Sequence, residues 1–133
     1  MKIAAVSDDG VTTSQHFGRA SVYVVFTVEN GEIVSREQRE KPGHRQFAGE
    51  EHGEGVASFQ GHGFDPQSQD RHARMAGAIS DCQVLIARGM GAGAYDSLHR
   101  AGIRVIMTDE PQIEEAVKAF LSGRLVDHPE RLH

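Results

Sequence analysis

The sequence predicts a single α/β domain with a five-stranded mixed sheet and three helices. Short apolar runs recur along the chain, helical apolar patterns separate the later runs, and glycines stand at the joins. Short strands that alternate with helical segments are typical of crossover units in a partly parallel sheet. A chain of 133 residues is long enough to bury a sizeable core as one domain.

The N-terminal part of the chain predicts three consecutive strands. Residues 2–6 are apolar and indicate a buried strand, and residues 21–28 are rich in β-branched and aromatic side chains. Asn30-Gly31 favours a hairpin turn, after which residues 32–39 return as an antiparallel strand. The charges along residues 32–39 favour a place at the sheet edge.

The C-terminal part alternates helices and strands. A helix is expected to begin at Asp65-Pro66, and its apolar face carries His72, Met75, Ala76 and Ile79. Further elements are then expected in this order: a strand at 84–87, a helix at 91–101 with Ala101 facing inward, a strand at 103–107, and a helix from Pro111 to Gly123.

The order of these elements predicts the sheet topology. Three strands in a meander are followed by two right-handed crossovers, with strand 2 antiparallel to the others. If strand 1 neighbours strand 4, the strand order is 3-2-1-4-5. The carboxyl ends of strands 1, 3, 4 and 5 then share one edge, where the loops 7–20, 40–66, 88–92 and 108–112 leave the sheet. Ligands favour such an edge where the winding of the sheet reverses, here between strands 1 and 4.

Two segments fall outside the regular pattern. Residues 40–66 are rich in glycine and contain His44, His52 and His62, which predicts a long loop. Residues 124–133 form a polar tail that we expect to pack loosely. The predicted domain therefore spans residues 1–123, with the glycine- and histidine-bearing loop inside it.

Composition narrows the function classes. The net charge is −5 and no basic block is present, which argues against a nucleic-acid partner. The chain has no apolar run of membrane-spanning length, so no membrane association is expected. Cys82 is the only cysteine, which excludes an internal disulfide and a four-thiolate metal site, and favours a cytoplasmic location.

The segment from Arg88 to Ala94 is the strongest single indication of function. It follows the apolar run at 84–87, contains three glycines, and leads into a predicted helix. A strand, a glycine turn and a helix together present backbone N–H groups to an anion. Arg88 adds positive charge at the end of the strand.

Several motifs carry a family resemblance. Asp8-Asp9-Gly10, the run from Ser14 to Arg19, the turn 88–91 and Ala101-Gly102-Ile103 resemble the nitrogenase iron–molybdenum cofactor accessory family. The likeness covers residues 2–39 and 67–123. It implies a ribonuclease H-like fold, with the same strand order 3-2-1-4-5, and the binding of metal–sulfur clusters or their precursors. Some relatives carry a cysteine where this chain has Ala20, so the resemblance implies no thiolate ligand at that position.

Reversible cluster binding needs few thiolates. Imidazoles, guanidinium groups, backbone N–H groups and a thioether would hold an anionic cluster and still release it. The resemblance and this chemistry together indicate eight candidate cofactor-binding residues: His16, Phe17, Gly18, Arg19, Arg88, Gly89, Met90 and Gly91. The candidate metal ligands are His16, His72, His44, His52 and His62.

Simpler roles are open for several of these residues. Phe17 would serve as a core residue that fixes its loop, and Arg19 would pair with Asp8 or Asp9. The glycines of the turn would serve only to pack the helix against the strand. His72 would be a core histidine with satisfied hydrogen bonds.

We therefore expect a carrier or scaffold for an iron- or molybdenum-containing metal–sulfur cluster, working with cluster donor or acceptor proteins and without turnover. The alternative is a metal- or anion-sensing regulatory module that uses the histidine-bearing loop. Enzymatic roles fit less well. The strand at 84–87 ends in Arg88 rather than in the acid that a two-metal nuclease needs, and the glycine turn lacks the P-loop lysine. The sequence leaves the oligomeric state open.

Overall fold

The computed structural model describes residues 1–41 and 66–132, with side chains described from residue 71 onward in the second segment. The elements of this part follow in chain order: β1 (Lys2–Ser7), the 3-10 helix η1 (Phe17–Arg19), β2 (Val22–Glu29), β3 (Glu32–Glu40), α2 (Pro66–Gly77), β4 (Val84–Ala87), α3 (Ala92–Arg100), β5 (Arg104–Met107), α4 (Ile113–Leu121) and the 3-10 helix η3 (Pro129–Arg131).

The strands form one mixed sheet in the order β3-β2-β1-β4-β5. Strand β2 runs antiparallel to both β1 and β3, whereas β4 runs parallel to β1 and to β5. This arrangement confirms the predicted strand order and the reversed direction of strand 2. It also confirms that the carboxyl ends of β1, β3, β4 and β5 share one edge.

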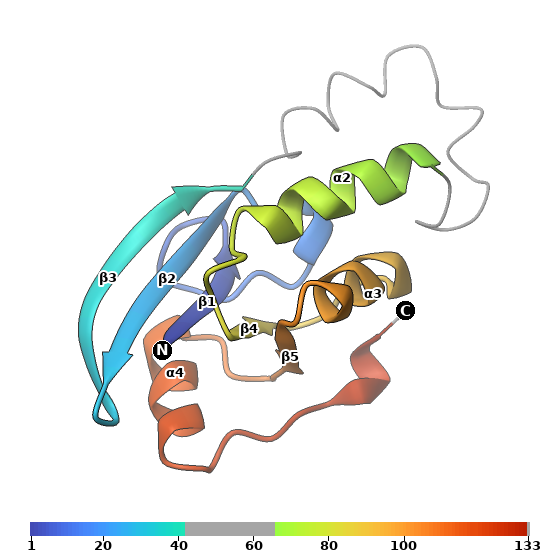
Figure 1. The fold of residues 1–133 in the computed structure, drawn as a ribbon. Coiled ribbons are helices and arrows are strands. Elements are labelled where there is room, and N and C mark those ends of the chain that lie inside the picture. The colour runs from blue at the N-terminus through green and yellow to red at the C-terminus, as the bar shows by residue number, and fades with distance from the viewer. Residues whose placement is uncertain (42–65, 133) are drawn as a thin grey trace.

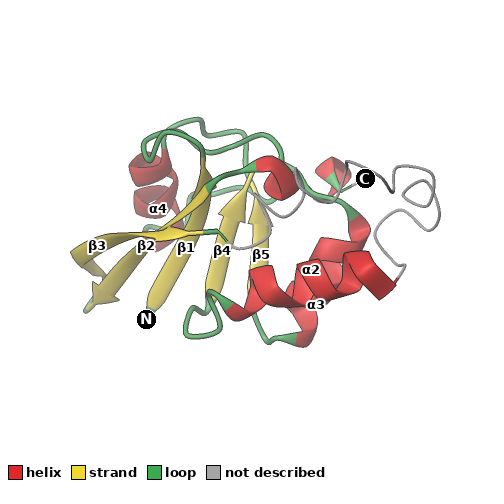
Figure 2. Ribbon diagram, turned by 90° about the horizontal axis from the view of Figure 1, so that it is seen from above, coloured by secondary structure: helices red, strands yellow, loops and turns green. Residues whose placement is uncertain are grey.

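Helices cover both faces of the sheet. Helices α2 and α3 lie side by side on one face, and α4 lies on the other (Figures 1 and 2). Two apolar clusters fill the spaces between these layers. The first contains Met75, Leu85 and Leu98, and the second contains Ile86 and the buried residues of α4. Burial of these apolar side chains is the main favourable contribution to folding.

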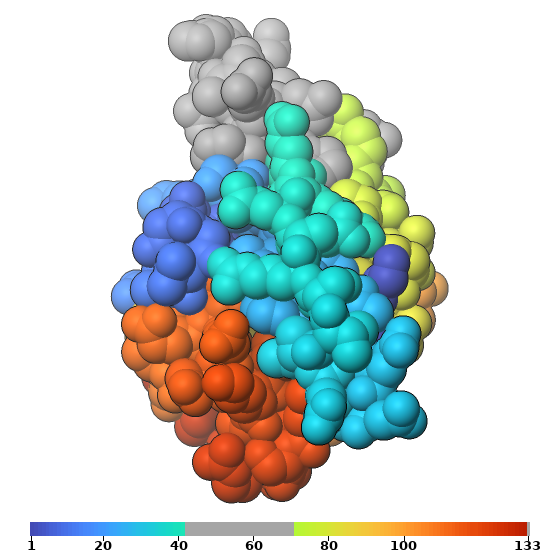
Figure 3. Space-filling view, turned by 90° about the vertical axis from the view of Figure 1, so that its left-hand side faces the viewer, coloured from blue at the N-terminus to red at the C-terminus, as the bar shows by residue number. Residues whose placement is uncertain are grey.

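Strand β3 forms an exposed edge of the sheet. Its side chains spread over one face of the molecule beside β2 and α4 (Figure 3). Most of its residues are exposed, and its charged side chains agree with the predicted edge position. The guanidinium of Arg39 donates to both carboxylate oxygens of Asp81, at 2.7 and 2.8 Å. This paired contact fastens the edge strand to the turn before β4.

The C-terminal tail differs from its expectation. The Met107 backbone N–H donates to the Asp127 carboxylate at 2.9 Å, and the His128 N–H donates to the Met107 carbonyl at 2.7 Å. Leu132 then pairs with Met90 in an isolated bridge and packs against the first core cluster. The prediction of a loosely packed tail is therefore wrong for this stretch, because a side-chain and a main-chain hydrogen bond to Met107 hold a polar segment that lacks apolar periodicity.

Element boundaries differ from the predicted ones by one or two residues. Helix α3 ends at Arg100, and Ala101 is an exposed cap rather than an inward-facing residue. The turn that follows needs Gly102, whose φ of 81° lies in the left-handed region. Among the helices of the described residues, none has the length and apolar character needed to span a bilayer.

Candidate functional site

Three of the loops at the carboxyl edge are joined by backbone hydrogen bonds. The Phe17 N–H donates to the Gly89 carbonyl at 3.2 Å, which links the loop after β1 to the glycine turn after β4. The Thr13 N–H donates to the Pro111 carbonyl at 2.8 Å, which links the same loop to the segment after β5. The predicted convergence of the histidine motif with the glycine turn is therefore confirmed, whereas residues 42–65 of the histidine-bearing loop expected beside them lie outside the described residues.

The histidine motif forms a tight turn around a buried ring. The Arg19 and Ala20 N–H groups donate to the His16 carbonyl at 3.2 and 3.1 Å, and the turn includes η1. The side chain of Phe17 is only 1% exposed and belongs to the first core cluster. His16, Gly18 and Arg19 are exposed. The buried ring thus anchors a turn that presents an imidazole and a guanidinium to solvent, and Phe17 takes the core position that sequence reasoning left open.

The glycine turn combines a half-buried cation with a helix N-terminus. Arg88 is half-buried, and its Nε is buried without a hydrogen-bond partner in the part of the chain that the structure describes. Gly91 is the N-cap of α3 and offers no side-chain oxygen to the first helical N–H groups. This turn therefore retains hydrogen-bond donors and positive electrostatic potential that suit an anion.

Met90 takes a different position from the one expected of a soft ligand. It is only 2% exposed and belongs to the first core cluster, together with Ala94 and Leu98. Its backbone pairs with Leu132 of the tail. The structure places its thioether in the core, where it helps to hold the turn instead of lining its surface.

The two aspartates after β1 build their own loop. The Asp9 carboxylate accepts hydrogen bonds from the Val11 and Thr12 N–H groups at 2.8 and 2.7 Å, and these bonds hold its pKa well below the usual range. Asp8 accepts from the Ser21 N–H at 3.1 Å. Arg19 forms no ion pair with either aspartate in the described ranges, so the alternative role considered for that arginine is not what the structure shows.

The candidate histidine ligands lie in different places. His16 is exposed at the histidine motif, and His72 is half-buried in α2, one turn before Met75. His44, His52 and His62 lie outside the described residues. Within residues 1–41 and 66–132, no three histidine, cysteine, aspartate or glutamate side chains are grouped so that they could hold a metal ion.

Sequence reasoning missed one charged residue next to the motif. Lys41 follows β3 directly at the carboxyl edge and is only 1% exposed. Its Nζ lies 4.6 Å from the centroid of the Phe17 ring. Its position after a strand that ends at the carboxyl edge could have placed Lys41 near this site. Its burial could not have been predicted, because lysines are almost always exposed.

Comparison with known proteins identifies the family. The family model described as dinitrogenase iron-molybdenum cofactor matches residues 1–123. The chain belongs to this family. The match includes both the histidine motif and the glycine turn, and it confirms the resemblance inferred from those residues.

Individual relatives agree with this assignment. An uncharacterized protein of Methanocaldococcus jannaschii is 30% identical over 125 residues, which cover 94% of this chain and 89% of the relative. The apo form of the orange protein from Desulfovibrio gigas has a TM-score of 0.65 at 21% identity, with 96% of this chain and 92% of that chain covered. The crystal structure of the protein PH0822 has a TM-score of 0.69 at 20% identity and covers 98% of each chain. These two structures share the fold.

Proposed function

We propose that this family member binds and carries, or scaffolds, an iron- or molybdenum-containing metal–sulfur cluster or a precursor of one. The observation that carries the proposal is the hydrogen bond from the Phe17 N–H to the Gly89 carbonyl. It holds the histidine motif against the glycine turn, so that an exposed imidazole and two guanidinium groups belong to one edge of the sheet. Membership of the dinitrogenase iron-molybdenum cofactor family supports a cofactor-like cluster as the cargo.

The chemistry of these groups suits cargo that must be released. In this proposal His16 supplies one metal ligand, and Arg19 and Arg88 neutralise the charge of the sulfides. The buried Nε of Arg88 has no described partner and is therefore available for a charge-assisted hydrogen bond. Without a thiolate in the set, the bonds to the metal stay exchangeable.

The proposal includes no catalytic turnover. Asp8 and Asp9 are engaged with backbone N–H groups of their own loop, and Arg88 stands at the end of β4 where a two-metal site would need an acid. The partners that this role requires are proteins that donate the cluster and accept it. We place this exchange in the cytoplasm, where the single Cys82 stays reduced.

The test is anaerobic reconstitution with iron, molybdate and sulfide, followed by desalting, metal and sulfide analysis and a visible spectrum. Stoichiometric metal and sulfide with a charge-transfer band is the expected result. Metal without sulfide would contradict a cluster cargo and indicate an ion site. Neither metal nor sulfide would contradict the proposed function altogether.

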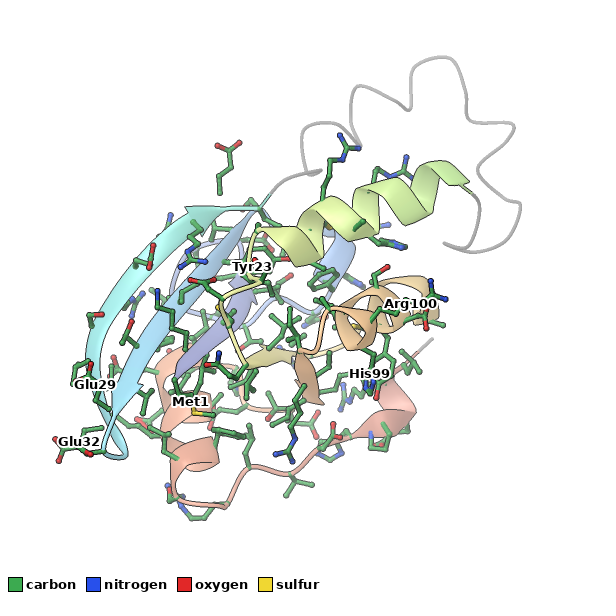
Figure 4. The ribbon with its side chains drawn as sticks, viewed as in Figure 1. Met1, Tyr23, Glu29, Glu32, His99 and Arg100 are labelled. Atoms are coloured by element: carbon green, nitrogen blue, oxygen red, sulfur yellow. The ribbon has the colours of Figure 1, made fainter. Side chains whose placement is uncertain are left out.

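Two variants test the site, and the chain offers matched controls. His16→Ala and Arg88→Ala are each expected to lower cluster uptake while the unfolding transition is retained. His99→Ala and Arg100→Ala remove the same residue types from the exposed far end of α3 (Figure 4). These controls are expected to load like the parent. Equal uptake by all four variants would remove the proposed site.

A further inference from the structure

Within the part of the chain that the structure describes, the ammonium group of Lys41 is buried against a thioether and an aromatic ring. The residue is only 1% exposed, and its Nζ lies 3.0 Å from the Sδ of Met75. The same Nζ lies over the ring of Phe17, 4.6 Å from its centroid. The Lys41 backbone is fixed too, because its N–H donates to the Ser21 carbonyl at 3.2 Å. The cation is therefore held in one place by α2, by the histidine motif and by the start of β2.

These contacts compensate the charge poorly. An ammonium has three donors, and a thioether is only a weak acceptor. The face of an aromatic ring contributes about 0.5–2 kcal/mol. Among the described residues, Asp8 is the carboxylate that acts on Lys41 through space, and it already accepts hydrogen bonds from Ser21. Burial lowers the pKa of Lys41 to about 8, so the group is still mainly charged at neutral pH.

The buried cation contacts a residue of the proposed site. Phe17 is in contact with Lys41 through its ring and bonds Gly89 through its backbone N–H. The exposed His16 is the neighbouring residue in the chain. A charge in a low-dielectric interior acts on nearby charges with little screening by water or salt. An anion at the histidine motif would be attracted by this ammonium without touching it.

We propose that Lys41 is a buried positioning cation that makes this site select ligands by charge, favouring multiply charged thiometallate anions over singly charged anions of the same shape. This inference rests on the proposed function and deepens it, because it names the chemical class of the cargo or precursor. The geometry that carries it is the single chain of contacts from Lys41 through Phe17 to the glycine turn.

The experiment compares two tetrahedral probes that differ by one charge. Tetrathiomolybdate is a dianion and tetrathioperrhenate a monoanion of nearly the same shape. Their dissociation constants are measured by absorbance titration at pH 7 for the parent and for Lys41→Met, Lys41→Arg and Lys118→Met. Lys118 is an exposed lysine of α4 that pairs with Glu114, and it serves as the control. Thermal unfolding of each variant checks the fold.

The parent is expected to prefer the dianion. For one interior charge acting over roughly 10 Å at an effective dielectric near 20, Lys41→Met should lower this preference about five- to twentyfold. Lys41→Arg should retain most of the preference, and Lys118→Met all of it. If Lys41 served only in packing, Lys41→Met would weaken the binding of both probes equally and leave the ratio of their dissociation constants unchanged, which would overturn the inference. If Lys41→Met fails to unfold cooperatively, Lys41→Gln replaces it with the same expected loss of preference.

The outcomes also separate this inference from the function on which it rests. A parent that binds neither thiometallate nor a reconstituted cluster contradicts both. A parent that takes up the cluster, with an unchanged probe ratio in the neutral Lys41 variants, contradicts only the role of Lys41. If Lys41→Arg also lost the preference for the dianion, the shape of the side chain rather than its charge would set that preference, and the proposed role of Lys41 would equally be overturned.

Discussion

Replacing Lys41 by methionine is expected to stabilise the protein, and the gain should depend on pH. Burial lowers the pKa of this lysine from its ordinary 10.5 to about 8. Each whole number in pKa corresponds to about 1.4 kcal/mol, so keeping the charged form in the native state costs about 3 kcal/mol. Methionine has a similar unbranched length and suits the same apolar contacts with Met75 and Phe17.

The direction of the pH dependence follows from proton binding. Below pH 8 the amine is charged in both the native and the unfolded state, so the full cost is present. Between pH 8 and 10.5 the unfolded chain keeps a proton that the native protein has lost, and the stability of the parent therefore rises with pH. Above pH 10.5 the amine is neutral in both states, and the cost of burying it as a cation has disappeared.

Urea unfolding followed by far-ultraviolet circular dichroism measures this difference at pH 7, 8, 9 and 10. Lys41→Met should exceed the parent in free energy of unfolding by up to about 3 kcal/mol at pH 7, and the excess should shrink toward pH 10. Burial also raises the pKa of Tyr23 above its ordinary 10.0, but this contribution is common to both proteins and cancels in the difference. An excess that stays constant across the series, or a variant less stable than the parent at every pH, would refute the reasoning.

Three further changes test other parts of the fold. Tyr23→Phe removes a buried hydrogen bond of 2.8 Å to a carbonyl of α2 and should lower the free energy of urea unfolding by about 1 kcal/mol. Gly10→Ala should lower it by about 1–2 kcal/mol, because φ is +80° and a new Cβ would lie 2.8 Å from the Gln38 Oε1, whereas Gly77→Ala meets open space and should be tolerated. The pKa of Asp9 is lower in the native protein than its ordinary 3.8, so the Asp9 carboxylate stabilises the native state above pH 3.8 and this stabilisation is lost as the pH falls further. Asp9→Asn should therefore be less stable than the parent at neutral pH, and its free energy of unfolding should decrease less steeply with acid.

The central strands β1, β2 and β4 could be predicted because most of their residues form apolar runs. Residues 84–87 are buried on all four positions, as a central parallel strand requires. Asn30 and Gly31 both have positive φ, which is what the hairpin prediction assumed for that dipeptide. Right-handed crossover connections left few possible strand orders, and the family resemblance selected the order 3-2-1-4-5 that the structure has.

The parts that could not be predicted depend on polar contacts between distant residues. The tail carries no apolar pattern, yet the His128 Nε2 lies 3.2 Å from Asp109 and its backbone bonds Met107. Met90 has the residue type of a soft ligand, and only the packing of α3 shows that it belongs to the core. Lys41 has the residue type of the surface, and only the folded chain shows it under the ring of Phe17.

A buried cation that attracts an anion must in turn be protonated more readily when that anion is present. This reciprocity follows from linkage: if the charge of Lys41 favours thiomolybdate, bound thiomolybdate favours the charged form of Lys41 and raises its pKa. At pH 8.5, just above the pKa of about 8, the free protein has lost much of this proton. Binding should therefore take up a fraction of a proton from the buffer, and calorimetry in buffers of different ionisation enthalpy measures that fraction.

The sign of this exchange distinguishes the two roles of the lysine. Tetrathiomolybdate carries no proton at pH 8.5, so any proton taken from the buffer on binding must go to a group of the protein. Lys41→Met should bind the anion more weakly and without the uptake, and Lys118→Met should behave like the parent. Proton uptake that persists in Lys41→Met would place the titrating group elsewhere. Absence of uptake in a parent that binds tightly would mean that the buried ammonium and the anion do not interact, and that the lysine serves only to pack against Phe17 and Met75.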